Sequence, residues 1–397
     1  MKKIYLDFAA TTPVDPKVLQ AMKPYFAQKF GNASEQHSLG QEAREAIETS
    51  RNKIANFLGA SNNEIIFTGS ATESINLSHK GLLEALASSG MKKFHIITSQ
   101  VEHKAMLETC KHLEKLGWAN VTYLPVDKFG MVSVTDIENA TTEHTVLVSI
   151  MYVNNEVGTI QPIKEIGNLL IKLNKRRTVN HEPRILFHTD ATQAIQYLDC
   201  NVDRLGIDFL SLTGHKIYAP KGVGALFVRS GTPLIRQMDG GGQELKLRSG
   251  TENVPYIVGL GKAVEVSAKC KVQRVKSIRS LQKLLISRIL QFPGVKLTGH
   301  PIKRAPHIVS FVVNNVEGEA LVLMLSAAGI MVSTGSACTS NSLEPSHVLT
   351  AMGVSAELSH GSVRFSLGKH TTEKEINDAV RIFEEIVQKL RLMAPQI

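Results

Sequence analysis

Hydrophobic residues along this chain form short apolar runs that alternate with longer segments of amphipathic spacing. The runs cover residues 64–68, 94–98, 145–153, 185–188 and 209–212, and helical spacing marks residues 16–26, 40–58 and segments that begin near 74 and 163. Short apolar runs bounded by polar or small residues are typical of buried strands, and their alternation with helices is typical of a parallel sheet. The pattern therefore predicts a large α/β domain.

The pattern changes beyond residue 256. A long helix is predicted over residues 260–292, followed by short strands near Val295, over 308–312 and over 361–368, and by a final helix. This order is typical of a smaller α+β domain, and we expect the N-terminal segment to pack onto it. The predicted division places residues 14–256 in the large domain and residues 1–13 and 257–397 in the small one.

Composition and charge exclude several classes of protein. The chain has 397 residues, 43% of them hydrophobic, and a formal net charge of +9 that no arginine-rich tail concentrates. We therefore expect no direct binding of nucleic acid. No apolar stretch is long enough for a membrane span, so the expected location is the cytoplasm. Four widely spaced cysteines without a C-x-x-C pair predict neither a disulfide framework nor a metal site.

Two charged residues stand where apolar runs of the predicted sheet end. The run 185–188 leads to Asp190, and the run 209–212 leads to Lys216. Since ligands of open α/β sheets bind at the carboxyl ends of the strands, this acid and this amine would face one cavity. Taken singly, an aspartate at a strand end is more often a helix N-cap, and a His-Lys pair is common. Their order, with the glycine-rich turn 220–224 behind them, favours a functional site.

The stretch D-x-x-Q from Asp190 to Gln193, followed by S-x-T-G-H-K-x-x-A-P-K-G-x-G up to Gly224, resembles the pyridoxal-phosphate enzymes of the aspartate-aminotransferase fold type. Within them it is similar to the cysteine desulfurases of the class V aminotransferase family. The resemblance implies pyridoxal 5′-phosphate as cofactor, with Lys216 as its covalent attachment site, Asp190 at the pyridinium nitrogen and Gln193 at the ring oxygen. The implied fold is fold type I, a large domain with a mainly parallel seven-stranded sheet flanked by helices and a smaller α+β domain.

A phosphate site is predicted where the first apolar run passes through a turn of small residues into a helix. Free backbone N–H groups and the helix dipole favour an anion there, so Ala71 and Thr72 are the predicted phosphate ligands. An ordinary capping box is the alternative for Thr72. The match to T-x-x-A-T-E-S-x-N favours the phosphate. The resemblance adds Thr213 and His215 and, across the interface of a homodimer, Thr251.

Three further residues follow apolar runs or lie within them. His103 matches the family's ring-stacking histidine, a position from which an imidazole can shuttle protons. Asn155, in V-N-N-E-x-G, would hydrogen-bond the cofactor or the substrate carboxylate, and an Asx turn is its alternative. Arg364 lies among apolar neighbours and matches the family's carboxylate-binding arginine, with a structural salt bridge as the alternative.

Cys338 is the predicted nucleophile. It lies among small residues that predict a loop able to carry its thiol, whereas Cys110, Cys200 and Cys270 lie in segments that we expect to pack. A free cysteine is more often a small buried hydrophobe. The match to S-x-G-S-A-C-T-S nevertheless favours catalysis.

The resemblance implies an enzyme that converts L-cysteine to L-alanine and leaves a persulfide on Cys338, while Lys216 and His103 move protons. The sulfur acceptor would be a protein such as an iron-sulfur scaffold or a tRNA-thiolation enzyme. The alternatives are a related enzyme acting on tRNA-linked serine derivatives, a selenocysteine lyase, and a non-catalytic protein with the same fold. The basic segment 172–184 is expected to be a solvated loop, with an acceptor or tRNA contact as the alternative.

Overall fold

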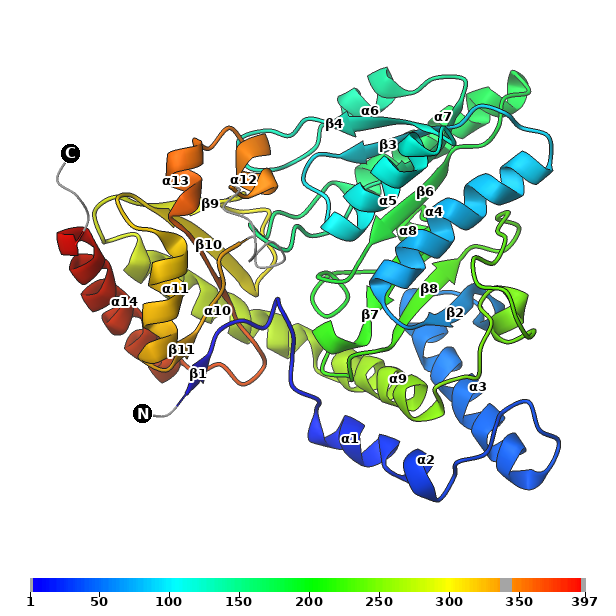
Figure 1. Ribbon diagram of the computed structural model, residues 1–397, viewed down its shortest axis with the longest axis horizontal. Coiled ribbons are helices and arrows are strands. Elements are labelled where there is room, and N and C mark those ends of the chain that lie inside the picture. The colour runs from blue at the N-terminus through cyan, green and yellow to red at the C-terminus, as the bar shows by residue number, and fades with distance from the viewer. Residues whose placement is uncertain (1–2, 336–344, 394–397) are drawn as a thin grey trace.

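The computed structural model describes residues 3–335 and 345–393 and shows two lobes, each built around its own β-sheet (Figure 1). In spatial order, the strands of the seven-stranded sheet are β2 (Ile65–Thr68), β8 (Gly224–Val228), β7 (Phe209–Thr213), β6 (Leu186–Asp190), β5 (Thr145–Ser149), β3 (His95–Ser99) and β4 (Asn120–Leu124). Neighbouring strands are parallel except for β8, which is antiparallel to β7 and β2. The prediction of an α/β fold with a mainly parallel sheet is confirmed.

Both faces of this sheet are buried, which explains the continuous apolar runs. One face is covered by α3 (Ser38–Leu58), α7 (Ile163–Val179) and α9 (Val254–Lys269), and the other by α4 (Ala71–Ser88) and α5 (Lys104–Lys115). Phe187 packs in the core beneath α3 and α7, whereas its neighbour Leu186 packs in the core beneath α4 and α5. Side chains alternate between the faces of a strand, so a strand covered on both sides is apolar at every position.

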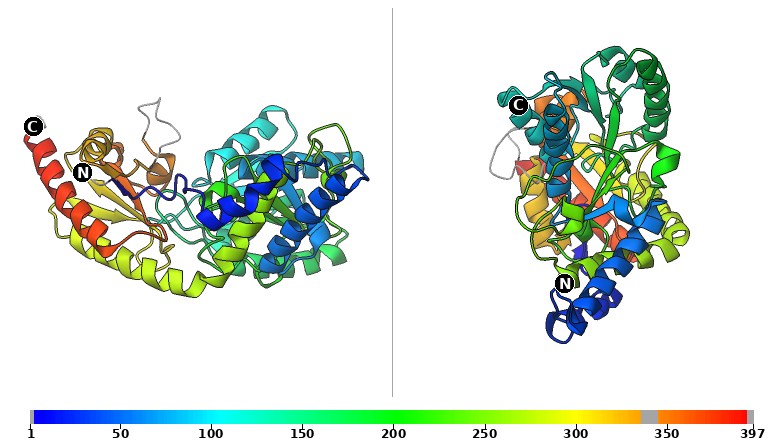
Figure 2. Two further views of the ribbon diagram at one scale, coloured as in Figure 1. Left: turned by 90° about the horizontal axis from the view of Figure 1, so that it is seen from below. Right: turned by 90° about the vertical axis from the view of Figure 1, so that its right-hand side faces the viewer.

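The smaller lobe contains a three-stranded antiparallel sheet with its own core. Its strands are β12 (Ser362–Ser366), β10 (Ile308–Val313) and β9 (Val295–Thr298), and its helices include α10 (Lys271–Ile289), α11 (Gly318–Ala327) and α14 (Glu373–Met393). The N-terminal β1 (Ile4–Tyr5) pairs in parallel with β11 (Ile330–Met331), and Leu6 is buried in the same core. The first and last described elements, β1 and α14, therefore both lie in this lobe (Figure 2).

The remaining elements are short. They are α1 (Pro16–Met22), α2 (Pro24–Ala27), α6 (Val134–Ala140), α8 (Val202–Leu205), α12 (His347–Ala351), α13 (Ala356–His360) and 3-10 helices at Asn62–Glu64, Gly214–Lys216 and Glu244–Lys246. None of the described helices is long and apolar enough to cross a membrane.

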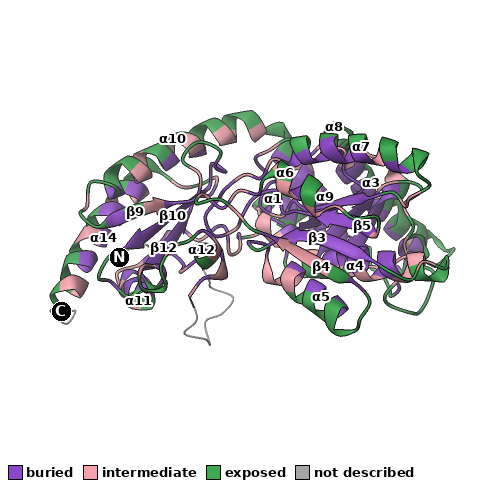
Figure 3. Ribbon diagram, turned by 90° about the horizontal axis from the view of Figure 1, so that it is seen from above, coloured by how far each residue is buried: buried purple, intermediate pink, exposed green. Residues whose placement is uncertain are grey.

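The helix predicted over residues 260–292 is two helices, and this prediction is wrong. α9 ends at Lys269 and packs on α1 and α3, whereas α10 begins at Lys271 and packs on α14 and β10. The break at Cys270 is the point at which the buried face changes from one lobe to the other. Cys270 is exposed, contrary to the prediction that its segment buries it. Figure 3 shows α10 with a mostly exposed outer face. The domain boundary at residue 256 stays a prediction, although the packing of α9 favours one nearer Cys270.

The basic segment 172–184 is also not the loop that we expected, because α7 continues to Val179. Arg177 is buried on this helix and donates hydrogen bonds to the carbonyl oxygens of Thr142 at 2.8 Å and Glu143 at 2.9 Å. The buried face of α7 therefore continues as far as Arg177, although the charged residues of this segment had predicted that it is exposed to solvent.

Two smaller differences concern element ends. The apolar run 145–153 is a strand only up to Ser149, after which the chain turns at the sheet edge. The helix predicted over residues 16–26 is divided at Lys23, because Pro24 has no N–H to continue the hydrogen bonding and instead begins α2.

Candidate active site

A cavity of about 620 Å³ lies between the two lobes at the carboxyl ends of β3, β5, β6 and β7. Thr251 is exposed and does not line it, and Cys338 lies outside the described residues. The other residues predicted from the sequence all line it, namely Ala71, Thr72, His103, Asn155, Asp190, Gln193, Thr213, His215, Lys216 and Arg364.

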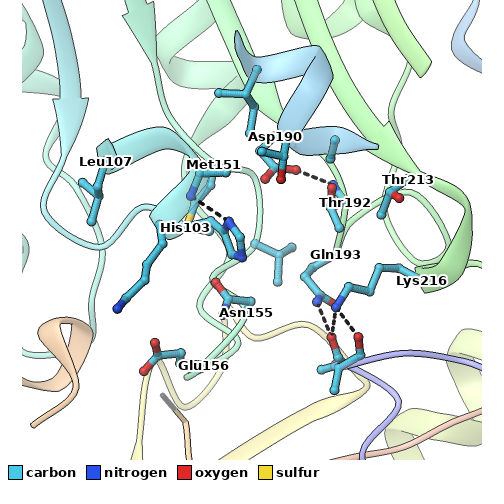
Figure 4. Close-up of a pocket in the computed structure, with 18 of the residues that line it drawn as sticks. His103, Leu107, Met151, Asn155, Glu156, Asp190, Thr192, Gln193, Thr213 and Lys216 are labelled. Atoms are coloured by element: carbon cyan, nitrogen blue, oxygen red, sulfur yellow. Dashed lines mark hydrogen bonds between the residues drawn. The ribbon is translucent and has the colours of Figure 1, made fainter. Parts of the chain in front are cut away.

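Lys216 ends a short 3-10 helix that directly follows β7. Its Nζ atom donates hydrogen bonds to the carbonyl oxygens of Ala9 and Ala10, each at 2.6 Å. Gln193 Nε2 also donates to Ala9 O at 3.0 Å, and Figure 4 shows the Lys216 and Gln193 side chains converging on these oxygens. The amine is therefore held inside the cavity by the N-terminal segment.

Asp190 is the last residue of β6 and is 8% exposed. Its Oδ1 atom accepts a hydrogen bond from the backbone N–H of Thr192 at 2.9 Å. Because β6 and β7 are parallel, with Asp190 opposite Ser211, the strand ends that carry Asp190 and Lys216 lie at the same sheet edge. The acid and the amine thus reach one cavity from neighbouring strands.

The N-terminus of α4 forms another wall. Ser70 is the N-cap residue, and its hydroxyl accepts from the Glu73 N–H at 3.1 Å, so Ser70 and not Thr72 caps the helix. Glu73 forms a 2.8 Å ion pair with Arg248, which offsets its charge. The first N–H groups of a helix have no partner within it, and the dipole is positive there. This wall therefore suits an anion.

His103 is the N-cap residue of α5 and lines the cavity. Its Nδ1 atom accepts from the Ala105 N–H at 3.1 Å, so the neutral ring carries its proton on Nε2. Burial lowers the pKa of His103, although the nearby Asp190 carboxylate favours the charged form. At neutral pH the ring is therefore uncharged and can donate a hydrogen bond from Nε2.

The two asparagines after β5 have different roles. Asn154 Oδ1 accepts from the N–H groups of Glu156 and Val157, each at 2.9 Å. The Asx turn that was the alternative for Asn155 is therefore made by Asn154. The Asn155 side chain is left to line the cavity (Figure 4).

Arg364 of β12 is 3% exposed and brings the small lobe to the cavity. Its Nη2 atom forms a 3.0 Å ion pair with Asp7 Oδ1, and its Nη1 atom donates to Asn155 O at 2.8 Å. The structural salt bridge considered as an alternative is thus present. Arg364 Nε is buried and has no hydrogen-bond partner among the described residues, which suits a bound carboxylate.

This geometry has counterparts among known proteins. The family model described as aminotransferase class-V matches residues 4–378. Proteins named cysteine desulfurase IscS are 48% identical over 99% of this chain and 94% of theirs in Methanosarcina thermophila, and 46% identical over 99% and 97% in Dictyoglomus turgidum. The chain belongs to the cysteine desulfurases of the aminotransferase class-V family. A solved NifS-like protein is similar to this cysteine desulfurase with a TM-score of 0.89 and 38% identity, covering 98% of this chain and 100% of that one.

The cofactor of this family is pyridoxal 5′-phosphate, and the residues of the cysteine desulfurase fit it. The N-terminus of α4 suits the phosphate, Lys216 supplies an amine for the aldehyde, and Asp190 supplies an acid for the ring nitrogen. The Thr192 hydroxyl lines the cavity and is buried without a hydrogen-bond partner among the described residues. Buried polar atoms are normally paired, so this orphan is consistent with a bound ligand.

Some residues of the cysteine desulfurase site were missed by sequence reasoning. Glu156, Ser346 and His347 line the cavity, and the carbonyl oxygens of Ala9 and Ala10 hold the lysine. Glu156 lies inside the V-N-N-E-x-G motif, which was a signal that could have found it. Backbone oxygens carry no residue-type signal.

Glu102, beside His103, makes stability depend on pH. Its carboxylate is buried and accepts hydrogen bonds from Met151 N and Ser99 Oγ, yet burial raises the pKa of Glu102 to about 8. The folded protein then keeps a proton that the unfolded chain loses near the ordinary carboxyl pKa. The contribution of Glu102 to the free energy of unfolding is therefore fully present at low pH and is lost as the pH rises to about 8. The loss is about 1.4 kcal/mol for each unit by which the folded pKa exceeds the unfolded pKa.

We therefore expect Glu102→Gln, which keeps an acceptor but does not ionise, to show a smaller fall in melting temperature between pH 6 and pH 9 than the unaltered protein. Differential scanning calorimetry with excess cofactor measures this. Glu45→Gln, at an exposed position, is the control and should leave the pH dependence unchanged. Parallel pH curves for Glu102→Gln and the unaltered protein would contradict the assignment.

Proposed function

We propose that this cysteine desulfurase converts L-cysteine to L-alanine and carries the released sulfur as a persulfide on Cys338. The observation that supports it is the convergence of Lys216, Asp190, His103 and Arg364 on one cavity between the lobes. When bound, pyridoxal 5′-phosphate supplies an electron sink for the charge that develops at the substrate Cα.

The residues of the chain divide the remaining work. Arg364 binds the substrate carboxylate through Nε, the donor that has no partner among the described residues. Lys216 takes and returns the proton at Cα, and His103 donates a hydrogen bond from Nε2. The Asp190 carboxylate, at the end of β6, stabilises a positive charge on the ring nitrogen of the bound cofactor.

Sulfur transfer needs no outside reductant. The Cys338 thiolate attacks the substrate sulfur, a sulfur–sulfur bond forms, and the bond from sulfur to Cβ breaks with its electron pair left on the substrate. That carbon takes up a proton, so one cysteine and one thiol give one alanine and one persulfide.

We also propose a homodimer. Thr251 is exposed and does not line the cavity of its own chain, which is consistent with a role at the phosphate of the other subunit. The proposed acceptor is a protein such as an iron-sulfur scaffold or a tRNA-thiolation enzyme, and the cytoplasm stays the predicted location.

Incubation of the purified holoenzyme with L-cysteine carrying radioactive sulfur tests the activity. We expect alanine and protein-bound label in equal amounts in the first turnover, with the label released by a thiol reductant. Selenocysteine and a serine derivative linked to tRNA are the competing substrates. Turnover of either of these without alanine from free cysteine would contradict the proposal.

A further inference from the structure

The buried Glu156 carboxylate contacts Gly335 and Ser346, two described residues that stand on either side of residues 336–344 in the sequence. The Ser346 hydroxyl donates a hydrogen bond of 2.5 Å to Glu156 Oε2. On the other side, the backbone of Gly335 lies so close that a Cβ atom there would be 3.0 Å from the same oxygen. The chain therefore enters and leaves the segment that carries Cys338 beside one carboxylate of the large lobe.

The turn that presents Glu156 is held from several directions. Asn154 Nδ2 donates to Val101 O at 2.9 Å, and Arg304 Nη1 donates to Val157 O at 2.7 Å. Arg304 is 1% exposed, so its bond to this turn is shielded from water. Because its backbone is fixed on both sides of the carboxylate, Glu156 can hold other residues in place.

Ser346 transmits this position to the helix that follows. Its hydroxyl oxygen also accepts from Leu349 N at 3.3 Å as the N-cap of α12. The adjacent His347 Nε2 lies 3.0 Å from Glu102 O, a second contact with the large lobe. Burial raises the pKa of Glu156 while His347 and Arg364 favour its charged form, and Oε2 can accept the Ser346 bond in either state.

We propose that Glu156 is a positioning residue that fixes Gly335 and Ser346 against the large lobe and thereby sets the rate at which Cys338 receives sulfur. The inference rests on the proposed function and assigns Glu156 to the second half of the reaction, the transfer of sulfur to Cys338. Binding of cysteine and loss of its Cα proton are assigned to Lys216 and Arg364 under the proposed function, and not to this contact.

The test uses holoenzyme variants Glu156→Ala, Ser346→Ala and the double variant, with Glu156→Gln as a rescue that keeps an oxygen acceptor. Ser355→Ala is the matched control, because Ser355 caps the neighbouring α13 in the same way and does not line the cavity. Stopped-flow absorbance follows the response of the cofactor to cysteine, and quenched flow follows persulfide on Cys338. Amide hydrogen exchange over residues 346–350 reports the anchoring without any turnover.

We expect persulfide formation to fall about tenfold in each single alanine variant and no further in the double, since each variant already removes the same Ser346–Glu156 hydrogen bond. The absorbance response should keep its rate, exchange over residues 346–350 should quicken about tenfold, and Glu156→Gln should recover most of the loss. Unchanged exchange in Glu156→Ala, additive losses, or an equal slowing of both steps would overturn the inference. If the unaltered enzyme forms no persulfide, the proposed function fails, and the exchange data still decide whether Glu156 anchors this segment.

Discussion

Lys216→Ala should reduce alanine formation from cysteine by about 10⁴-fold or more. Lys216 is the amine that the N-terminal carbonyl oxygens hold within the cavity, and loss of a positioned acid–base group alone costs about 10²–10⁴. Loss of the attachment point for the cofactor adds to that cost. The assay is alanine release per cofactor bound.

Borohydride reduction of the unaltered protein gives an independent reading. It should attach the cofactor to the peptide that contains Lys216. Lys221→Ala, an exposed lysine in the following turn, is the matched control and should keep both the label and the rate. A label on any other lysine would make the assignment of Lys216 wrong.

The strands of the large sheet could be predicted because their environment is uniform. The run 209–212 became β7, Phe209–Thr213, since a strand covered on both faces has apolar residues at every position. The helix break at Cys270 has no such signal. The apolar spacing continues across it, and what changes is the lobe against which the buried face packs.

Charge misled sequence reasoning in the segment that contains the buried Arg177. Arg177 and Arg304 are 5% and 1% exposed and donate to backbone carbonyl oxygens, a role that depends on chain segments distant in sequence. An arginine side chain can donate several hydrogen bonds in a fixed geometry, so it can join segments inside a protein. The basic stretch 172–184 looked solvated because composition does not reveal those acceptors.

Part of the candidate site could likewise be predicted from the sequence, and part could not. Asp190 and Lys216 could be placed together from strand ends, because the carboxyl ends of parallel strands meet at one edge. Contacts between the lobes could not be placed. The Arg364–Asn155 and Ser346–Glu156 hydrogen bonds join residues far apart in the chain, and sequence patterns of strands and helices carry no information about such pairs.

Cys338→Ala should separate the two halves of the reaction. The cofactor should stay bound and cysteine should still change its absorbance, because Lys216, Asp190 and Arg364 are intact. Alanine formation should fall by at least about a thousandfold, since removing a covalent nucleophile closes the route that divides one difficult step into two easier ones. Mass spectrometry should find no persulfide on the variant.

Cys270→Ala is the matched control for this experiment. Its thiol is exposed at the junction of α9 and α10 and does not line the cavity, so its loss should leave alanine formation and persulfide unchanged. The buried thiols offer no substitute, because burial raises the pKa of both Cys110 and Cys200 to about 12 and keeps them protonated at neutral pH. If Cys338→Ala consumed cysteine at the rate of the unaltered enzyme and released sulfide with pyruvate and ammonia in place of alanine, persulfide chemistry would be wrong, and a direct elimination of sulfide at the same cofactor site would replace it.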